Sequence, residues 1–443
     1  MQDAIDGVAS GASGSVVRGA LISTFRRLVR LYFRDIERLG VAPEPDTRGR
    51  VFVANHTNAL IDPVVVMTDA RCAISPIAKS TLWNIPGLNW LLDRAGAVPI
   101  IRRKDTPDKD ASANGAIFDK IAAHLAGGGN ILIFPEGTSH SEPRLAPLRT
   151  GAARMLLAAN ERHGAPLTFQ AVALEFERRT EFRSRALVLW GPVRRLADVA
   201  GATDEERVAN ITAQMKTDLE ELLVEGETHA DRMRIARVAE MFANDAGDSS
   251  LGGWSDIGRK VELAQKALRS QSPEISGSAR LVARAIETID AYYTELDRLG
   301  ASDAQIVGIA PPRPPAKPRW QRALMAPLAA SGFALYALPY FVPRWLARNT
   351  DADATSTYKL GSALVVYPLW AAGLVGASFT LLPPPLSFVG AGVALASPFA
   401  ALQWLDELYQ RRPDLSTDDR AKLARLRIAA RTAIDEARAK LPA

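Results

Sequence analysis

The chain has 443 residues, 47% of them hydrophobic and 23% charged, which is enough for two or three domains with substantial cores. Its formal net charge of +5 and pI near 9.3 are mildly basic. This balance fits an ordinary solvated surface or attraction to phosphate-bearing molecules and anionic lipid heads. The single cysteine, Cys72, excludes a disulfide within the chain and a cysteine cluster for zinc or iron–sulfur, and it fits a reducing compartment. The basic residues lack the interleaved aromatics of nucleic-acid binders, so no nucleic-acid partner is expected.

The N-terminal residues divide into two parts. Residues 1–14 are polar and rich in Gly and Ser, and they predict a disordered segment without the apolar run of a signal peptide. Residues 15–40 predict a basic amphipathic helix, in which five arginines alternate with leucine, isoleucine and phenylalanine. Such a helix suits a membrane interface, and the alternative is a surface helix that packs on its own domain.

Residues 41–200 predict an α/β domain, because short apolar runs alternate with helical stretches. Helical patterns at 111–126 and 150–161 lie between these runs. The expected strands are 51–54, 73–78, 97–101, 131–134, 169–174 and 186–190.

The remainder of the chain predicts helices in two different environments. Residues 201–310 combine charged faces with helical apolar periodicity, interrupted by a loop at 245–253. Residues 311–318 are rich in proline and predict an extended linker. Membrane-embedded helices are expected at 319–405, followed by a charged, arginine-rich helical tail at 406–443.

The membrane prediction rests on two runs that lack charged residues. One covers 21 positions, 323–343, and the other covers 46 positions, 360–405. About 20 apolar residues cross a bilayer, so the longer run is long enough for two crossings with a turn at Pro383–Pro385. The shorter run contains three prolines and fits a crossing, an interfacial helix or a re-entrant segment. For both runs the alternative is a buried soluble hairpin.

The charges that flank the apolar runs bear on orientation. Positive flanks stay cytoplasmic, which favours an even number of crossings and an integral membrane protein whose α/β domain lies on the cytoplasmic face. The acidic residues of the tail dilute this signal.

A histidine and an aspartate follow the first expected strand. His56 and Asp62 are separated by five residues, in the sequence Asn-His-Thr-Asn-Ala-Leu-Ile-Asp. A histidine at a strand end can act as general base toward a hydroxyl, while a nearby carboxylate fixes its tautomer and stabilises the imidazolium. The alternative is a histidine that caps the next helix.

Three later blocks carry further candidate side chains. The strand at 97–101 is followed by Arg102 and Arg103, which suit either a bound phosphate or an anchor on lipid phosphates. The sequence Phe134-Pro-Glu-Gly-Thr-Ser139 follows the next strand, and its glycine and hydroxyls allow an anion to approach the backbone. The apolar run Ala171–Leu174 fits an acyl slot or plain core, and the core interpretation is favoured.

In this order, the four blocks resemble those of the glycerolipid acyltransferase superfamily, the glycerol-3-phosphate and lysophosphatidate acyltransferases. The resemblance covers roughly residues 20–195, and its most specific part is Phe134–Gly137, followed by Ser-His and by Leu148-Arg-Thr-Gly-Ala152. The family usually has four residues between His and Asp, where this chain has five, and proline where this chain has Ala171. The longer spacing and the Phe-Arg-Ser-Arg stretch at 182–185 resemble the fungal dual glycerol-3-phosphate/dihydroxyacetone-phosphate branch.

The resemblance implies a role for each matching residue. His56 would be the base, Asp62 would orient it, and Arg102 would bind the phosphate of the acceptor. The candidate substrate-binding residues are Arg102, Glu136, Gly137, Thr138 and Lys79. No cofactor and no metal are expected. The histidines without metal-ligand spacing are His124, His140, His163 and His229.

The implied function is transfer of a fatty acyl group at a lipid bilayer, in phospholipid biosynthesis. The donor would be acyl-CoA or acyl-carrier protein, and the acceptor a hydroxyl of glycerol 3-phosphate or 1-acylglycerol 3-phosphate. The acceptor would attack the thioester directly, since the chain has no Gly-x-Ser-x-Gly sequence for a serine nucleophile. Two alternatives stay open: an acyltransferase for another lysophospholipid or an amine, and a non-catalytic membrane adaptor on the same fold.

Overall fold

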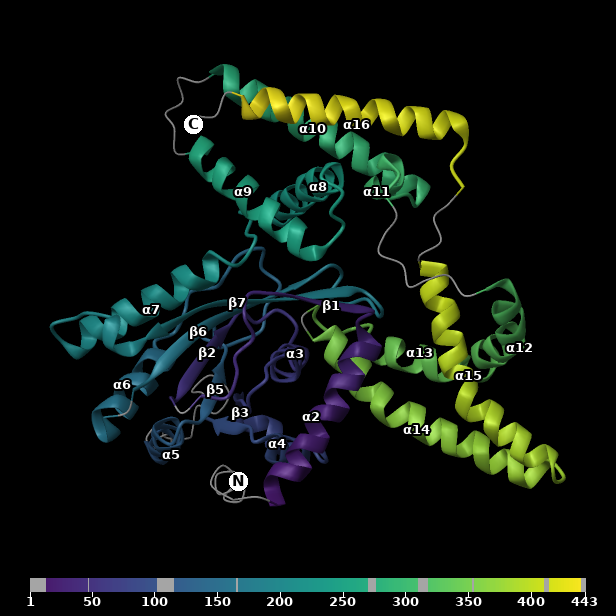
Figure 1. Cartoon of the computed structure of the whole chain (residues 1–443), viewed down its shortest axis with the longest axis horizontal. Helices are drawn as coiled ribbons and strands as arrows, with labels where there is room; N and C mark the ends of the chain where they lie inside the picture. The colour runs from purple at the N-terminus through teal and green to yellow at the C-terminus, as the bar shows by residue number, and fades with distance from the viewer. Residues whose placement is uncertain are drawn as a thin grey trace. The chain divides into compact units, whose positions relative to one another are not determined.

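The chain divides into two compact units, each with its own core. The first comprises Met1–Leu223 with Ala352–Ala354, and the second comprises Val224–Asp351 and Thr355–Ala443. The computed structural model (Figure 1) describes residues 13–46, 48–101, 115–164, 166–269, 276–309, 318–352, 354–409 and 414–439.

The first unit is built on a seven-stranded sheet with the order β1-β7-β6-β2-β5-β3-β4. Six strands confirm the six predicted apolar runs, and β1 was not predicted. Only β6 and β7 pair antiparallel among these strands, and the other neighbours run parallel. The strands are β1 (Asp35–Leu39), β2 (Arg50–Ala54), β3 (Ser75–Lys79), β4 (Val98–Ile100), β5 (Asn130–Ile133), β6 (Thr168–Phe176) and β7 (Arg185–Arg195).

Helices cover this sheet, as expected for an α/β domain. They are α2 (Ser13–Tyr32), α3 (Ile61–Asp69), α4 (Leu88–Ala95), α5 (Gly115–Ala126), α6 (Gly151–His163) and α7 (Asp204–Glu220). Side chains alternate across a strand, so Val51 and Val53 of β2 point to one face, where they share a core with α5, α6 and α7. Leu125 and Leu156 are fully buried in that core.

Two predicted boundaries of this unit were wrong. The domain was expected to end at residue 200, but α7 buries Ile211, Met215 and Leu219 in the same core as the sheet, so the unit extends to Leu223. The predicted helix at 15–40 ends at Tyr32, and residues 35–39 form β1, which pairs with β7. Residues 13 and 14 belong to α2, while the rest of the segment expected to be disordered lies outside the described residues.

The helix α2 packs on its own domain along one side. Val29 and Tyr32 are buried, Arg26 donates to the Thr68 carbonyl at 3.0 Å, and Arg18 donates to the Ile74 carbonyl at 2.6 Å. These contacts agree with the alternative interpretation of the sequence, that of a packed surface helix. A position in a membrane interface stays a prediction for the exposed side of α2, where Val16 lies.

The second unit contains two groups of helices. The charged group comprises α8 (His229–Asp245), α9 (Leu251–Arg269), α10 (Ser276–Leu299), α11 (Asp303–Val307) and α16 (Thr417–Arg438), and the loop predicted at 245–253 separates α8 from α9. Threonine and serine side chains cap two of these helices: Thr228 accepts from the Asp231 N–H and Ser416 from the Asp419 N–H. Most of the predicted linker lies outside the described residues, and its last residue, Pro318, immediately precedes the apolar group.

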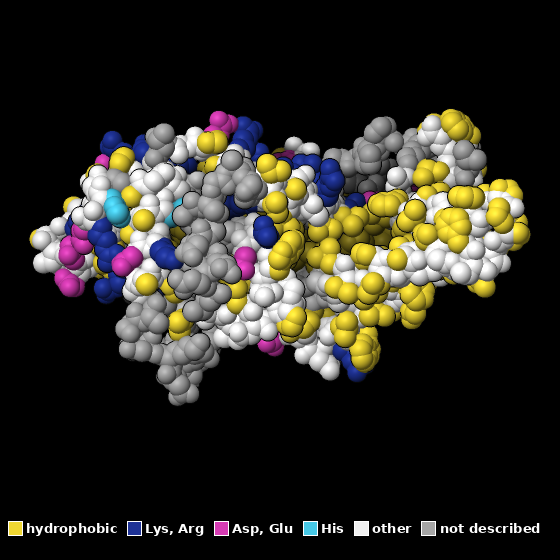
Figure 2. Space-filling model, turned by 90° about the horizontal axis from the view of Figure 1, so that it is seen from below, with side chains coloured by type: hydrophobic (Ala, Val, Ile, Leu, Met, Phe, Trp, Pro, Cys, Tyr) yellow, Lys and Arg dark blue, Asp and Glu magenta, His cyan; other side chains and the backbone are white. Residues whose placement is uncertain are grey.

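The apolar group comprises α12 (Arg319–Leu335), α13 (Ala337–Leu346), α14 (Thr355–Leu381) and α15 (Leu386–Tyr409). Two described helices, α14 and α15, are long and apolar enough to cross a membrane, and α12 with α13 would be a third span only as a pair bent by 45°. The turn predicted at Pro383–Pro385 lies between α14 and α15. Figure 2 shows hydrophobic side chains spread over the right-hand end of the view, where Figure 1 places α14 and α15.

Candidate active site

The sheet topology brings the predicted residues to one edge. Because β2, β5, β3 and β4 run parallel as neighbours, their carboxyl ends lie side by side. His56 follows β2, Glu136 follows β5, and Lys79 is the last residue of β3. Arg102 lies outside the described residues, and Ile100, two positions before it, ends β4 at the same edge. Open α/β sheets bind their ligands at this edge.

The imidazole of His56 is held by a buried carboxylate. His56 Nδ1 and Asp62 Oδ2 are 2.9 Å apart, and Asp62, in the first turn of α3, is fully buried. The same oxygen accepts the backbone N–H of Thr57 at 2.8 Å and of Asn58 at 2.7 Å. An Nδ1–H donated to a carboxylate leaves Nε2 as the basic nitrogen of the neutral ring.

The five-residue spacing does not prevent this contact. The turn after His56 holds Ala59 at a φ of 38°, in the left-handed region, and is closed by a hydrogen bond of 2.9 Å from the Ile61 N–H to the Asn58 carbonyl. A left-handed alanine costs roughly 1–2 kcal/mol. The hydrogen bonds that Asp62 accepts from the N–H groups of Thr57 and Asn58 offset that strain. The carboxylate therefore still contacts the imidazole although the loop is one residue longer.

Glu136 joins the loop after β5 to the loop after β2. One oxygen accepts the backbone N–H of His56 at 2.7 Å, and the other accepts the Ala146 N–H at 2.9 Å and contacts His140 Nε2. The carboxylate is buried, and both of its oxygens are occupied by protein groups. The sequence predicts that Glu136 helps to hold the substrate; in the structure its oxygens contact the backbone N–H groups of His56 and Ala146 and the ring of His140.

The ring of His56 is fixed on several sides. It stacks on Phe134 with centroids 4.1 Å apart and an interplanar angle of 20°. Its backbone carbonyl accepts the His140 N–H at 3.0 Å, which complements the bond from its own N–H to Glu136. Within the described residues Nε2 has no hydrogen-bond partner, and the side chain is 18% exposed. The ring is therefore oriented by the protein while one basic nitrogen is free to act.

Three further predicted residues lie at the same edge of the sheet: Gly137 and Thr138 in the turn after β5, and Lys79 at the end of β3. Gly137 has a φ of 77°, and a Cβ at this position would lie 2.5 Å from Nε of Arg149, so the turn requires glycine. Thr138 and Lys79 are exposed, as is Arg149, whose backbone N–H bonds the Pro135 carbonyl at 2.8 Å. The edge thus offers cationic and hydroxyl groups beside the turn that carries Glu136.

The fourth block is structural. Ala171–Leu174 is buried within β6, which confirms the core interpretation over an acyl slot. Leu174 also exchanges two hydrogen bonds with the Asn55 side chain, at 2.8 and 3.0 Å, and so fixes the start of the His56 loop. In the Phe-Arg-Ser-Arg stretch, Arg183 donates to the Arg30 and Leu31 carbonyls and fastens the end of α2.

A separate cavity of about 580 Å³ lies at the opposite, amino end of β2. Its buried guanidinium, Arg50, donates to Thr168 at 3.1 Å, to Gln170 at 3.2 Å and to Asp46 at 3.4 Å, so its three nitrogens all have partners within the protein. Among the described residues no cluster of three or more His, Cys, Asp or Glu side chains is arranged to hold a metal ion.

His140 is the residue of the site that sequence reasoning missed. Its ring contacts Glu136 and its backbone N–H bonds the His56 carbonyl, although the sequence alone indicates only that it follows the Phe134–Gly137 block. The signal was present in the spacing, because a histidine four residues after a buried glutamate at a tight turn can fold back onto it.

The Glu136 carboxylate raises the pKa of His140 above its ordinary value of 6.5, through a hydrogen bond and charge attraction that outweigh burial. A histidine whose pKa is higher in the folded than in the unfolded chain stabilises the fold fully below the unfolded pKa of about 6.5. This stabilisation is lost over the pH interval between the unfolded and the folded pKa. The free energy of unfolding should therefore fall across that interval. His140→Gln should abolish this slope and cost about 1–3 kcal/mol at lower pH.

Thermal or denaturant unfolding of the detergent-solubilised chain, measured at a series of pH values, checks this. His163→Gln, at an exposed position at the end of α6, is the matched control and should keep the slope. An unchanged pH slope in His140→Gln would contradict the assignment.

Residues 35–174 match the family model described as Acyltransferase. Glycerol-3-phosphate O-acyltransferase 2 of Saccharomyces cerevisiae is 23% identical over 284 residues, which are 58% of this chain and 37% of that protein. A chloroplastic 1-acyl-sn-glycerol-3-phosphate acyltransferase of Brassica napus is 27% identical over 121 residues, 27% of this chain and 33% of that protein. The matched stretches thus span about a third of the length of these curated relatives.

A solved structure is also similar: the 1-acyl-sn-glycerophosphate acyltransferase of Thermotoga maritima is 19% identical, with a TM-score of 0.34, over 46% of this chain and 80% of that one. The family match begins at β1 and ends in β6, and so contains the whole loop system around His56. The Acyltransferase match over residues 35–174 and the two curated relatives support the glycerolipid acyltransferase superfamily for this chain.

Proposed function

We propose that this chain transfers a fatty acyl group from an acyl thioester, acyl-CoA or acyl-carrier protein, to a hydroxyl of glycerol 3-phosphate or 1-acylglycerol 3-phosphate. The observation that carries the proposal is the clamped imidazole of His56, bonded to buried Asp62 through Nδ1 and without a partner at Nε2 among the described residues. The names of the two curated relatives give glycerol 3-phosphate and its 1-acyl derivative as acceptors of those proteins.

The reaction follows from one free basic nitrogen. His56 Nε2 takes the proton of the acceptor hydroxyl as its oxygen attacks the thioester carbonyl carbon. The Asp62 carboxylate, 2.9 Å from Nδ1, stabilises the imidazolium that forms. The tetrahedral intermediate then collapses: the new C–O bond remains, the C–S bond breaks, and the leaving sulfur receives the proton from Nε2. Such a transfer needs no covalent acyl-enzyme.

The acceptor's phosphate is proposed to bind at the same edge of the sheet. Arg102, Lys79, Gly137 and Thr138 are the proposed substrate contacts, and exposed Arg149 is a further candidate because it lies against the Gly137 turn. Guanidinium groups bind phosphate oxygens in pairs, with charge-assisted hydrogen bonds. Glu136 is proposed to act indirectly, through the backbone N–H of His56.

The bilayer is proposed as the place of the reaction, with the α/β domain on the cytoplasmic face. Two helices, α14 and α15, are long and apolar enough to cross it, and the acylated product formed from either acceptor carries a fatty acyl chain. The arginine-rich tail that follows them favours the cytoplasmic side.

The test is turnover by the purified full chain with labelled acyl-CoA and each acceptor in turn. Acyl transfer to one of the two phosphate acceptors is expected. Arg102→Ala should then raise the KM for that acceptor about 10- to 100-fold with a smaller change in kcat, since a bond to a charged group contributes roughly 1.5–3 kcal/mol. Arg103→Ala is the matched control.

Failure of acyl transfer with either acceptor would reject the proposal. Transfer with an unchanged KM in Arg102→Ala would reject only the phosphate contact, and it would point instead to an acceptor that lacks a free phosphate monoester.

A further inference from the structure

The tail helix α16 folds together with helices that precede the apolar group. α16 packs along α10, and its Leu423 and Ala430 are fully buried in one core with Tyr292 and Leu296 of α10. Met241 of α8 belongs to the same core. Helices that lie more than 100 residues apart in the chain, on either side of the apolar group, therefore form one helical module.

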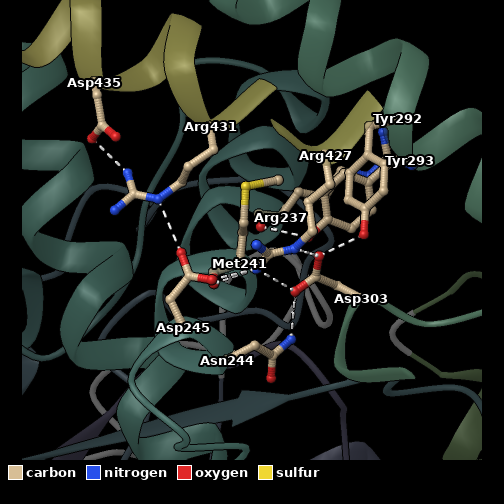
Figure 3. Close-up of polar contacts among 10 residues, drawn as sticks. All are labelled: Arg237, Met241, Asn244, Asp245, Tyr292, Tyr293, Asp303, Arg427, Arg431 and Asp435. Carbon is tan, nitrogen blue, oxygen red and sulfur yellow. Dashed lines mark hydrogen bonds and ion pairs between the residues drawn. The ribbon is translucent and has the colours of Figure 1, made fainter. Parts of the chain in front are cut away.

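A buried polar network fixes this packing (Figure 3). Arg427 of α16 donates to Asp303 of α11 at 2.8 Å, and Asp303 is fully buried. The Asp303 carboxylate also accepts from Tyr292 at 2.6 Å and from Asn244 at 2.8 Å. Burial, followed by this carboxylate, raises the pKa of Tyr292, so its hydroxyl stays protonated and donates. Side chains of four helices, α8, α10, α11 and α16, meet at this one carboxylate, which specifies how α16 docks.

Around this centre lies a second carboxylate. Asp245 of α8 accepts from Arg427 at 2.6 Å and from Arg431 at 2.9 Å. Arg431 also lies over the ring of Phe242, 3.7 Å from its centroid. The docking of α16 thus combines apolar burial with at least two ion pairs, and it is not a loose surface contact.

The packing of α16 onto α8, α10 and α11 limits how the chain between them can cross a membrane. The chain leaves the module after α11, passes through α12–α15, and re-enters the module at α16. A folded, charged module cannot have one helix on the opposite side of a bilayer, so both ends of the apolar group lie on the same side. The number of crossings is therefore even, which excludes three.

The helices α14 and α15 are suited to be the two crossings. They are joined by the short turn at 382–385, and 46 residues without a charge, 360–405, include that turn. At 1.5 Å per residue the two helices are about 40 and 36 Å long, compared with about 30 Å of hydrocarbon. A tip without charges can pass through the hydrocarbon layer at low cost.

The bent pair α12–α13 packs in a way that keeps it from being a third crossing. Residues later in the α12 segment contact residues earlier in α15. A Cβ at Gly332 would meet the Ser397 carbonyl, while the Tyr336 hydroxyl, four residues on, donates to the Ala394 carbonyl at 2.8 Å. α12 is thus antiparallel to α15, and its start lies toward the end of α15. The break between the two helices is satisfied inside the protein, because Trp370 Nε1 donates to the Leu335 carbonyl at 2.8 Å.

The other end of the bent pair lies toward the start of α14. α13 contacts α14 and is joined to it by only eight residues, 347–354, as in an antiparallel helical hairpin. Near this end, Arg344 lies 4.4 Å from the Tyr340 ring centroid and Arg348 lies 5.1 Å from that of Trp345. Basic and aromatic side chains of this kind favour the head-group region.

We infer that the lipid bilayer is crossed twice, by α14 and α15, and that α12–α13 enters and leaves on the side of the α8–α11/α16 module. The inference concerns membrane crossing and does not rest on the acyl-transfer chemistry. It places residues 291, 352 and 421 on one side of the bilayer and the tip at 381 on the other.

Single-cysteine labelling tests this in the full chain. In a Cys72→Ser background, the variants Ala291→Cys, Ala352→Cys, Ala421→Cys and Leu381→Cys place one thiol at exposed positions. Sealed membranes of one orientation are treated with a membrane-impermeant maleimide, then permeabilised and treated again. Each variant should be labelled after permeabilisation, which serves as its accessibility control.

The first three variants should show the same sidedness, and Leu381→Cys should show the opposite one. Ala352→Cys on the side opposite to Ala291→Cys would mean that α12–α13 crosses, and it would overturn the inference. Leu381→Cys on the same side as Ala291→Cys would likewise overturn two complete crossings.

Discussion

Replacing His56 by alanine should lower kcat for acyl transfer by about 10²- to 10⁴-fold, the range that a positioned general base contributes. The reason is that Nε2 of this ring takes the proton of the attacking hydroxyl in the proposed reaction. The KM of the acceptor should change little, because the proposed contacts to its phosphate come from other side chains. Initial rates with saturating acyl-CoA and varied acceptor separate the two constants.

The structure explains why His56→Ala should remove the imidazole without disturbing the fold of its loop. The bonds that order the loop use the backbone of His56: its N–H to Glu136, and its carbonyl to the His140 N–H. These bonds survive the loss of the ring, so the variant should keep its circular dichroism and its recovery in membranes. His163→Ala at the exposed end of α6 is the control and should retain full activity. A His56→Ala variant with wild-type kcat would remove the catalytic proposal.

Most of the sheet was predictable from the sequence, because buried parallel strands are continuous apolar runs. The exception is β1, whose sequence Asp-Ile-Glu-Arg-Leu is charged and lies at the sheet edge. Its apolar residues, Ile36 and Leu39, are three apart, which matches a helix as well as a strand. Its pairing with β7 is a contact across 150 positions of sequence, which no local pattern reports.

The sequence predicts which residues form the candidate site, but it does not predict the role of each one. The pairing of His56 with Asp62 follows from proximity and residue type, and the structure places the two in contact. The role of Glu136 does not follow from the sequence, since a glutamate in a turn can face a ligand or the protein. Its partners are backbone N–H groups from two loops, and only the folded chain shows that they converge on one carboxylate.

The helical module was the least predictable part. The sequence of α16 has the charge pattern of a solvated helix, and its arginines were interpreted as a cytoplasmic flank. In the structure Arg427 is bonded to Asp303, a contact across 124 positions, and Leu423 is fully buried. Composition alone predicts the apolar helices α12–α15 that lie between them. The packing of α16 onto the helices before this group depends on the contact between Arg427 and Asp303, which are far apart in the sequence.

Asp303→Ala should cost the helical module about 3–5 kcal/mol, because it leaves the mostly buried guanidinium of Arg427 without its innermost partner. It also removes the acceptor of the Tyr292 hydroxyl and of the Asn244 amide. Asp245→Ala is the matched comparison. It removes a carboxylate from the same arginine, but Asp245 is 31% exposed while Asp303 is fully buried. Since water screens that pair, its loss should cost about 1 kcal/mol or less.

Hydrogen exchange of the α16 amides in the detergent-solubilised chain distinguishes these two outcomes. The buried-centre variant should expose α16 to exchange at a rate raised by two or more orders of magnitude, as expected for a loss of about 3 kcal/mol or more. The Asp245→Ala variant should stay within about tenfold of the wild type. Equal, small effects in both variants would mean that apolar packing alone docks α16. In that case the polar network would not be what holds the two ends of the apolar group on one side of the bilayer.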